Sequence, residues 1–102
     1  MIYCFDIDGT ICETNKSEYT DSKPKKYVID EINRLYDSGN TIKMFTARGA
    51  NSGIDWYNFT ENQLDSWGLK YTELIMGKPH ADIFIDDKAI SDREWISRTR
   101  EV

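Results

Sequence analysis

The chain opens with MIYCFDIDGT, residues 1–10, and this stretch decides the fold. Residues 2–5 form a short apolar run that ends at Asp6, and Gly9 follows closely. The length of the run, its aromatic content and the glycine favour a strand that is buried on both faces. Strands of that kind belong to parallel sheets covered by helices, so the opening stretch predicts an α/β protein.

The rest of the chain alternates helical and strand patterns. Residues 13–26 are polar and predict a loop or a small hairpin. Asp21 or Ser22 is placed to cap a helix that carries Pro24 in its first turn and ends at Gly39. The later predicted elements are a strand at 41–46, a helix at 54–67, strands at 71–76 and 81–85, and a short helix that begins at Ser91. This order predicts a mostly parallel sheet with right-handed crossovers.

The composition fits one small domain, residues 1–102. The net charge of −5, with both signs interspersed, argues against a nucleic-acid partner. We expect Cys4 and Cys12 to be free thiols, because two cysteines do not make a disulfide framework in a chain of this size. No apolar run approaches the ~20 residues that span a membrane, so we expect a cytoplasmic protein without a membrane partner.

The sequence contains four short polar clusters, three of which follow predicted strands while one lies on the link between the third and fourth strands. They are residues 6–10, 46–48, 78–79 and 86–87. The carboxyl ends of parallel strands lie at one edge of a sheet, and ligands of open α/β sheets bind at that edge. The convergence of four separate segments therefore predicts one polar site there.

Carboxylates dominate this predicted site, which would gather Asp6, Asp8, Asp86 and Asp87. Two like charges ~4 Å apart repel each other by about 4 kcal/mol at an effective dielectric constant of ~20. A bound cation removes that repulsion. Hard oxygen ligands without nearby cysteine or histidine partners favour Mg²⁺ over Zn²⁺, so the sequence predicts a magnesium site.

Two further groups in the clusters suit a phosphate. Lys78 offers a positive charge, and Thr46 offers a hydroxyl with backbone amides beside it. A phosphoryl group in transfer spreads negative charge over its equatorial oxygens. With Mg²⁺, these groups would neutralise the charge that otherwise repels an attacking carboxylate, so the sequence favours phosphoryl transfer.

The four clusters resemble the motifs of the haloacid dehalogenase-like superfamily of phosphatases. Residues 5–10, FDIDGT, match its D-x-D-G-T motif, Thr46 after an apolar strand matches the second motif, Lys78 the third, and residues 85–87 the fourth. The motifs occur in order over most of the chain. The resemblance implies a Rossmann-like three-layer α/β/α fold in which the first strand lies between the second and the fourth.

The resemblance also implies a role for each residue of the site. Asp6 would attack phosphorus and form an aspartyl-phosphate, and Asp8 would protonate the leaving oxygen and then activate water. Mg²⁺ would be held by the Asp6 carboxylate, the Asp8 backbone carbonyl and the Asp86 carboxylate. The other implied residues are Thr46, Ala47 and Lys78, which bind the phosphate, and Asp87 and Thr10, which support the site from behind.

The connections between the motifs leave no room for a cap domain. Residues 11–26 allow only a flap, and residues 51–77 are used by one helix and one strand. An open site has to be covered by the substrate or by a second copy in a homo-oligomer. The chain also resembles, less specifically, small phosphatases of capsule or lipopolysaccharide synthesis, which favours a small sugar phosphate as the substrate.

Three residues keep more than one interpretation. Arg48 suits bidentate contact with a carboxylate or phosphate of the substrate, or lies on the surface. The single histidine, His80, is more typical of a loop residue than of a ligand, and Lys88 is more typical of a structural residue.

Two alternative functions use the same site residues. A receiver-like phosphoacceptor module also surrounds a phosphorylated aspartate with acids, Mg²⁺, Thr and Lys. Its acid pair follows the first strand, however, whereas here the pair comes last. A non-catalytic domain that keeps the fold is the second alternative. Because every expected catalytic residue is present, the sequence favours the enzyme.

Overall fold

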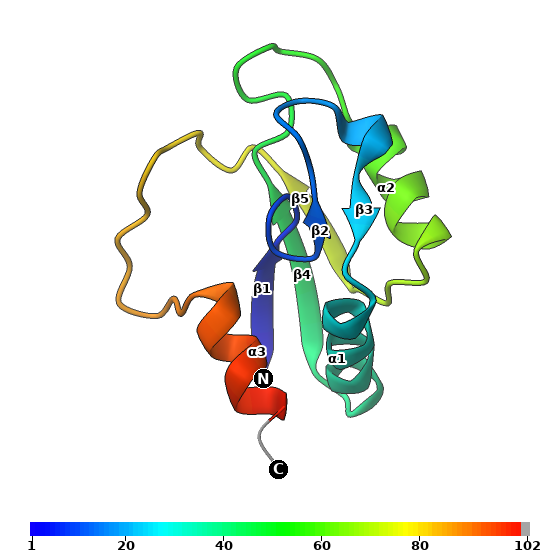
Figure 1. Cartoon of the computed structure of the whole chain (residues 1–102), viewed down its shortest axis with the longest axis vertical. Coiled ribbons are helices and arrows are strands. Elements are labelled where there is room, and N and C mark those ends of the chain that lie inside the picture. The colour runs from blue at the N-terminus through cyan, green and yellow to red at the C-terminus, as the bar shows by residue number, and fades with distance from the viewer. Residues whose placement is uncertain (101–102) are drawn as a thin grey trace.

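The computed structural model describes residues 1–100 of the chain. It is an α/β fold in which three helices accompany a three-stranded parallel sheet (Figure 1). The strands are β1 (Ile2–Asp6), β4 (Thr41–Thr46) and β5 (Glu73–Met76), in the order β1-β4-β5. The helices are α1 (Lys26–Asp37), α2 (Tyr57–Ser66) and α3 (Asp92–Arg100). The predicted parallel sheet is confirmed.

One face of the sheet carries the core. Side chains alternate along β4, so that Ile42, Met44 and Thr46 are buried while their neighbours are half-exposed. Phe5 of β1 lies opposite Met44 in the ladder and joins the same face. The helices complete this core with Val28, Ile29 and Ile32 of α1, Leu64 of α2 and the half-buried Trp95 of α3, whose ring centroid lies 5.0 Å from that of Phe5.

Strand β1 is an edge strand. It pairs with β4 through residues 2–6, and no strand within residues 1–100 pairs with its other side. Ile2 and Cys4 are exposed. The expectation that this strand is buried on both faces is therefore wrong, as is its placement between two neighbours, because the fourth strand that should cover it does not form.

Residues 77–91 form a long irregular segment between β5 and α3 (yellow to orange in Figure 1). The predicted strand at 81–85 is wrong, since Ile83, Phe84 and Ile85 are 76%, 52% and 95% exposed. A strand exists only where a neighbour takes up its backbone hydrogen bonds, and no described strand lies beside this segment. The apolar run alone therefore did not suffice to define the element.

The flap predicted at 11–26 is a small hairpin. Strands β2 (Cys12–Glu13) and β3 (Lys23–Pro24) pair antiparallel, and a 3-10 turn, η1 (Tyr19–Asp21), lies between them. Because Pro24 belongs to β3, it cannot open a helix. The predicted caps Asp21 and Ser22 are therefore wrong, and α1 begins after Lys25 without a side-chain cap.

The later helix boundaries agree with the sequence in part. Helix α2 begins at Tyr57, three residues after the predicted start, and ends near the predicted stop. The Glu94 backbone N–H donates to Ser91 Oγ at 3.1 Å, which confirms Ser91 as the cap of α3. Within residues 1–100, no helix is both long enough and apolar enough to cross a bilayer.

Candidate active site

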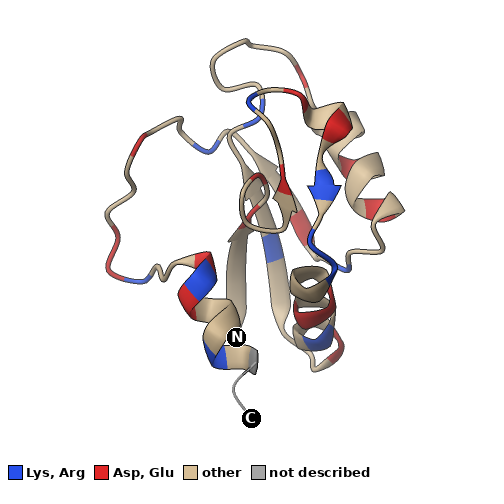
Figure 2. Cartoon of the chain, in the orientation of Figure 1, with Lys and Arg blue, Asp and Glu red and all other residues tan. Residues whose placement is uncertain are grey.

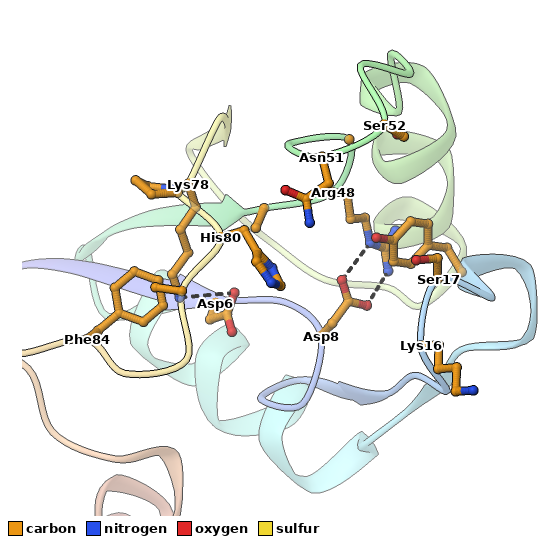
Figure 3. A pocket seen from close by; sticks show the side chains of 15 residues that line it. Asp6, Asp8, Lys16, Ser17, Arg48, Asn51, Ser52, Lys78, His80 and Phe84 are labelled. Carbon is orange, nitrogen blue, oxygen red and sulfur yellow. Dashed lines mark hydrogen bonds and ion pairs between the residues drawn. The ribbon is translucent and has the colours of Figure 1, made fainter.

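A cavity of about 410 Å³ opens at the carboxyl end of the sheet (Figure 3). Its walls come from four segments: the end of β1, the flap, the loop after β4 and the loop after β5. The polar residues among those that line it are Asp6, Asp8, Lys16, Ser17, Tyr19, Arg48, Asn51, Ser52, Lys78 and His80. The predicted meeting of the first three polar clusters at one edge is thus found.

Asp6 ends β1 and faces Lys78, which follows β5. Lys78 Nζ lies 3.5 Å from Asp6 Oδ1, and the Asp6 side chain is 35% exposed. Burial raises the pKa of Asp6, and the neighbouring Lys78 charge opposes that rise only in part. Lys78 also lies 4.3 Å from the ring centroid of Phe84. Asp6 is therefore a half-exposed carboxylate with one cation beside it, open to a ligand.

Asp8 is held far more tightly than Asp6. Arg48 Nε donates to Asp8 Oδ2 at 2.9 Å and Arg48 Nη2 donates to Oδ1 at 2.8 Å, a bidentate pair (Figure 3). The Thr14 hydroxyl of the flap donates to Oδ1 at 2.6 Å. Burial acts to raise the pKa of Asp8, but the Arg48 and Thr14 hydrogen bonds outweigh it and lower the pKa overall. Asp8 is therefore ionised in the free chain.

Arg48 reaches Asp8 from within the protein. Its side chain has no exposed surface, and Arg48 Nη1 donates to Thr60 Oγ1 at 3.2 Å and to Gln63 Oε1 at 2.8 Å. The guanidinium carbon lies 4.6 Å from the ring centroid of Tyr19. The interpretation of Arg48 as a surface residue is wrong, and its donors bind groups of the protein itself.

The end of β4 places its two predicted phosphate residues differently. Ala47 lines the cavity, whereas Thr46 is buried and does not. Thr46 Oγ1 accepts a hydrogen bond from the Arg48 backbone N–H at 3.1 Å, and the Thr46 carbonyl accepts one from the Lys78 backbone N–H at 3.0 Å. Thr46 therefore holds the backbone of the two cationic residues of the site, Arg48 and Lys78.

The predicted acidic pair of the fourth cluster does not reach the cavity. Asp86 and Asp87 are exposed on the segment 77–91, outside the cavity lining. Asp86 Oδ1 accepts a hydrogen bond from the Lys88 backbone N–H at 2.8 Å. Within the described part of the chain, no three His, Cys, Asp or Glu side chains form a group that could hold a metal.

Figure 2 shows that the segment between β5 and α3 carries basic and acidic residues along its length. Thr10 does not line this cavity, but lines a second hollow of about 230 Å³ between the flap and α3. His80 lines the first cavity, while Lys88 is exposed outside it.

Sequence reasoning missed the residues that hold Arg48 and Asp8. Thr14 and Tyr19 lie in the flap, whose polar composition only predicts a loop. Thr60 and Gln63 lie three residues apart on α2, so both face the same side of the helix. A polar pair at that spacing beside the apolar residues Phe59 and Leu64 was the one available signal.

The comparisons with known proteins give a fold but no function. No protein-family model matches the chain, and no curated protein matches it. Its structure is similar to the crystal structure of a structural-genomics target from Vibrio cholerae, with a TM-score of 0.85 and 27% sequence identity. The similarity covers 94% of this chain and 87% of that chain, which supports the α/β arrangement described above.

Proposed function

We propose that this chain is a magnesium-dependent phosphomonoester hydrolase of the haloacid dehalogenase type. The observation that carries the proposal is the gathering of Asp6, Asp8 and Lys78 around one cavity at the carboxyl end of a parallel sheet. Lys78 lies about 70 positions after the two aspartates in the sequence, and each of the three residues has the chemistry that phosphoryl transfer requires.

Asp6 is the nucleophile in this proposal. One of its carboxylate oxygens forms a bond to phosphorus while the bond from phosphorus to the leaving oxygen breaks, which gives an aspartyl-phosphate. Water then attacks phosphorus, inorganic phosphate leaves and the Asp6 carboxylate is regenerated. Lys78, 3.5 Å from Asp6 Oδ1, lowers the repulsion between the carboxylate and the phosphate dianion.

Asp8 is the proton carrier in both steps. The ionised form that Arg48 and Thr14 favour is the form that accepts a proton from the attacking water. To protonate the leaving oxygen in the first step, Asp8 has to take up a proton when the phosphate dianion binds. The hydrogen bonds of the free chain therefore prepare the second step more directly than the first.

Magnesium fits the donor atoms of the cavity in kind. Mg²⁺ takes one or two protein carboxylates and completes its shell with water and phosphate oxygens, and Asp6 and Asp8 supply oxygens at the strand end. When bound, the ion would neutralise charge on the phosphate. The third ligand, Asp86, is outside the cavity, and we include in the proposal a movement of the part of segment 77–91 beyond Lys78 that carries Asp86 to Asp6.

Two observations support this movement. Burying one large apolar side chain contributes about 1.5–3 kcal/mol, and Ile83, Phe84 and Ile85 are all exposed. The outer side of β1 leaves unpaired backbone groups that attract an extended segment. Packing the segment there would also place β1 between two strands, as the finer, Rossmann-like arrangement requires.

The far wall of the cavity indicates the class of substrate. Lys16 and Ser17 from the flap and Asn51 and Ser52 from the loop after β4 add hydrogen-bonding groups beyond the carboxylates. Such groups suit a hydroxyl-rich leaving group, so we propose a small sugar phosphate. Because no cap covers the site, a second copy of the chain would exclude water where the substrate does not.

One observation favours the receiver-like phosphoacceptor as a second candidate function. Both oxygens of Asp8 already accept hydrogen bonds from Arg48 or Thr14. If Asp8 cannot break these hydrogen bonds, an aspartyl-phosphate on Asp6 would have no base to activate water and would persist. The lifetime of the phosphorylated form separates this candidate from the hydrolase.

The test is a panel of sugar phosphates and other phosphomonoesters, measured with Mg²⁺ and with a chelator. We expect release of inorganic phosphate that requires Mg²⁺ and is lost in Asp6→Asn. Stable phosphorylation of the wild-type chain by a small phosphodonor, without release, would establish the receiver-like function. If no substrate gives release of inorganic phosphate or phosphorylation of the chain, both candidate functions are overturned.

A further inference from the structure

We infer that Arg48 is a positioning residue that fixes the Asp8 carboxylate at the cavity, and that it does not bind the substrate. This inference deepens the proposed function and rests on it. It concerns a buried ion pair that joins three segments of the chain: the end of β1, the loop after β4 and the flap.

The geometry of Arg48 excludes a role in recruiting a ligand from solvent. Its side chain has no exposed surface, whereas the Asp8 side chain keeps 27% of its surface exposed. The guanidinium donates hydrogen bonds to Asp8, Thr60 and Gln63, all of which are groups of the protein itself. Asp8 therefore keeps exposed surface at the cavity, while Arg48 binds it from the protein interior (Figure 3).

The supports of Arg48 explain why its geometry is fixed. Its own backbone N–H is bound by Thr46 Oγ1 at the end of β4, so the residue leaves the sheet in a defined direction. The side chain then lies against the Tyr19 ring and donates to Gln63 Oε1 at 2.8 Å. A planar guanidinium held on several sides orients a carboxylate better than a single point charge does.

The same network ties the flap to the acid. Gln63 Nε2 donates to the Tyr19 carbonyl at 2.7 Å, and the Tyr19 ring packs edge-on against Trp56, with centroids 4.9 Å apart. Thr14, at the other end of the flap, donates to Asp8. The flap therefore contacts Arg48 through Tyr19 and Asp8 through Thr14, and the position of Asp8 depends on it.

The test compares Arg48 variants with Asp8→Asn on p-nitrophenyl phosphate and on glycerol 2-phosphate, with Mg²⁺ present. We expect Arg48→Met to lower kcat by about 100-fold, the low end of what a general acid–base contributes, with KM changed by less than about threefold. The double variant Asp8→Asn/Arg48→Met should be no slower than Asp8→Asn alone, because Arg48 acts through Asp8. The alkyl ester, whose leaving oxygen needs a proton, should suffer more than the nitrophenyl ester.

Two further variants control the measurement. Arg48→Lys keeps the charge but loses the bidentate geometry, and we expect it to restore only part of kcat. Arg34→Met removes an arginine that pairs with Glu31 on the surface of α1, and we expect it to leave kcat unchanged. If Arg48→Met does not fold, Arg48→Lys and Gln63→Leu provide the same comparison.

Three outcomes would overturn the inference. They are a raised KM with kcat preserved, losses that multiply in the double variant, or equal losses on the two esters. If the wild-type chain hydrolyses no phosphomonoester, the proposed function fails instead. The melting temperatures of the single and double variants then show separately whether Arg48 and Asp8 are coupled, and strictly additive shifts would overturn the ion-pair role as well.

Discussion

Lys78 Nζ lies 3.5 Å from Asp6 Oδ1, although the strands that precede these residues do not pair with each other. Strand β4 separates β1 from β5. Asp6 is the last residue of β1 and Lys78 follows β5 by two residues, so the two side chains meet over the end of β4. The Lys78 backbone N–H donates to the Thr46 carbonyl, which holds the lysine in that position. The parallel arrangement of the three strands therefore brings a carboxylate and an ammonium group together across the end of the sheet.

The first prediction is that Asp6→Asn abolishes turnover while the fold survives. The variant keeps the size of the side chain but removes the nucleophile, and loss of a nucleophile in covalent catalysis costs about 10⁴-fold or more in kcat. Burial already disfavours the charged form of Asp6, so the melting temperature should change by only a few degrees. Steady-state phosphate release measures the loss of turnover, and circular dichroism measures whether the fold survives.

Asp21→Asn, in the exposed turn of the flap, is the matched control and should retain activity. A wild-type rate in Asp6→Asn would show that no covalent bond forms at this residue. A folded but silent Asp6→Asn variant would leave the hydrolase mechanism in place.

Local sequence patterns foretold the sheet because each strand of it carries its own signal. β4 was predicted with its observed limits, since an apolar run between Gly39 and the polar end of the strand is unambiguous. Asp6, Asp8 and Lys78 were predicted together because parallel strands end at one edge. These predictions have in common that each strand and each strand end can be identified from residues that are adjacent in the sequence.

The errors concern features that depend on distant partners. The run Ile83-Phe84-Ile85 has the composition of a strand, but a strand needs a neighbour to bond with, and no strand among residues 1–100 lies beside it. Arg48 was placed on the surface or against a substrate because nothing in its local sequence indicates Asp8, 40 positions earlier. Tertiary hydrogen bonds of this kind have no local pattern.

The second prediction concerns the stability of the chain in acid. The folded pKa of Asp8 lies below its ordinary value of 3.8, so its ion pair stabilises the chain above that pH, and the stabilisation is lost as the pH falls through the folded pKa. The raised pKa of Asp6 acts in the opposite direction, because protonation then favours the folded state. Asp8→Asn should therefore flatten the loss of stability below about pH 4.

Urea unfolding of the wild-type chain and of Asp8→Asn across the acid range measures this effect. Asp30→Asn, whose partner Lys26 is exposed, is the control and should keep the wild-type slope. If Asp8→Asn shows the same acid slope as the wild-type chain, the pair with Arg48 does not hold the Asp8 charge in solution.

The third prediction is that Mg²⁺ raises the melting temperature and that Asp86 contributes to the effect. A ligand at 100 times its Kd stabilises the folded state by about 2.7 kcal/mol, which corresponds to roughly 10 °C or more in a domain of this size. Asp6→Asn should remove most of the shift. Asp86→Asn should reduce it, because we propose that residues 77–91 carry Asp86 to the ion.

Asp82→Asn lies on the same exposed segment and is the control for a general loss of charge. Calorimetric scans at several magnesium concentrations give the apparent Kd for each variant. Equal magnesium responses in Asp86→Asn and in the wild-type chain would mean that the segment stays where the structure places it and that Asp86 is not a ligand.

The fourth prediction concerns the loop that carries Arg48 into the site. Gly49 has φ of +84°, and a Cβ there would collide with the Ile54 carbonyl oxygen and lie 3.3 Å from Trp56 Cδ1. Gly39 has a similar φ of +91°, but a Cβ there meets nothing within 4 Å. Both alanine variants carry the cost of the left-handed backbone, about 1–2 kcal/mol, and only Gly49→Ala adds the collision, worth a further 1–3 kcal/mol or so.

Chemical unfolding of the two variants separates these contributions. Gly49→Ala should be the less stable by about the collision cost, and it should also lose phosphatase activity, since Ala47, Asn51 and Ser52 of the same loop line the cavity. Gly39→Ala, at the far end of α1, should keep its activity. Equal stabilities would show that the loop moves aside to accept a side chain at position 49.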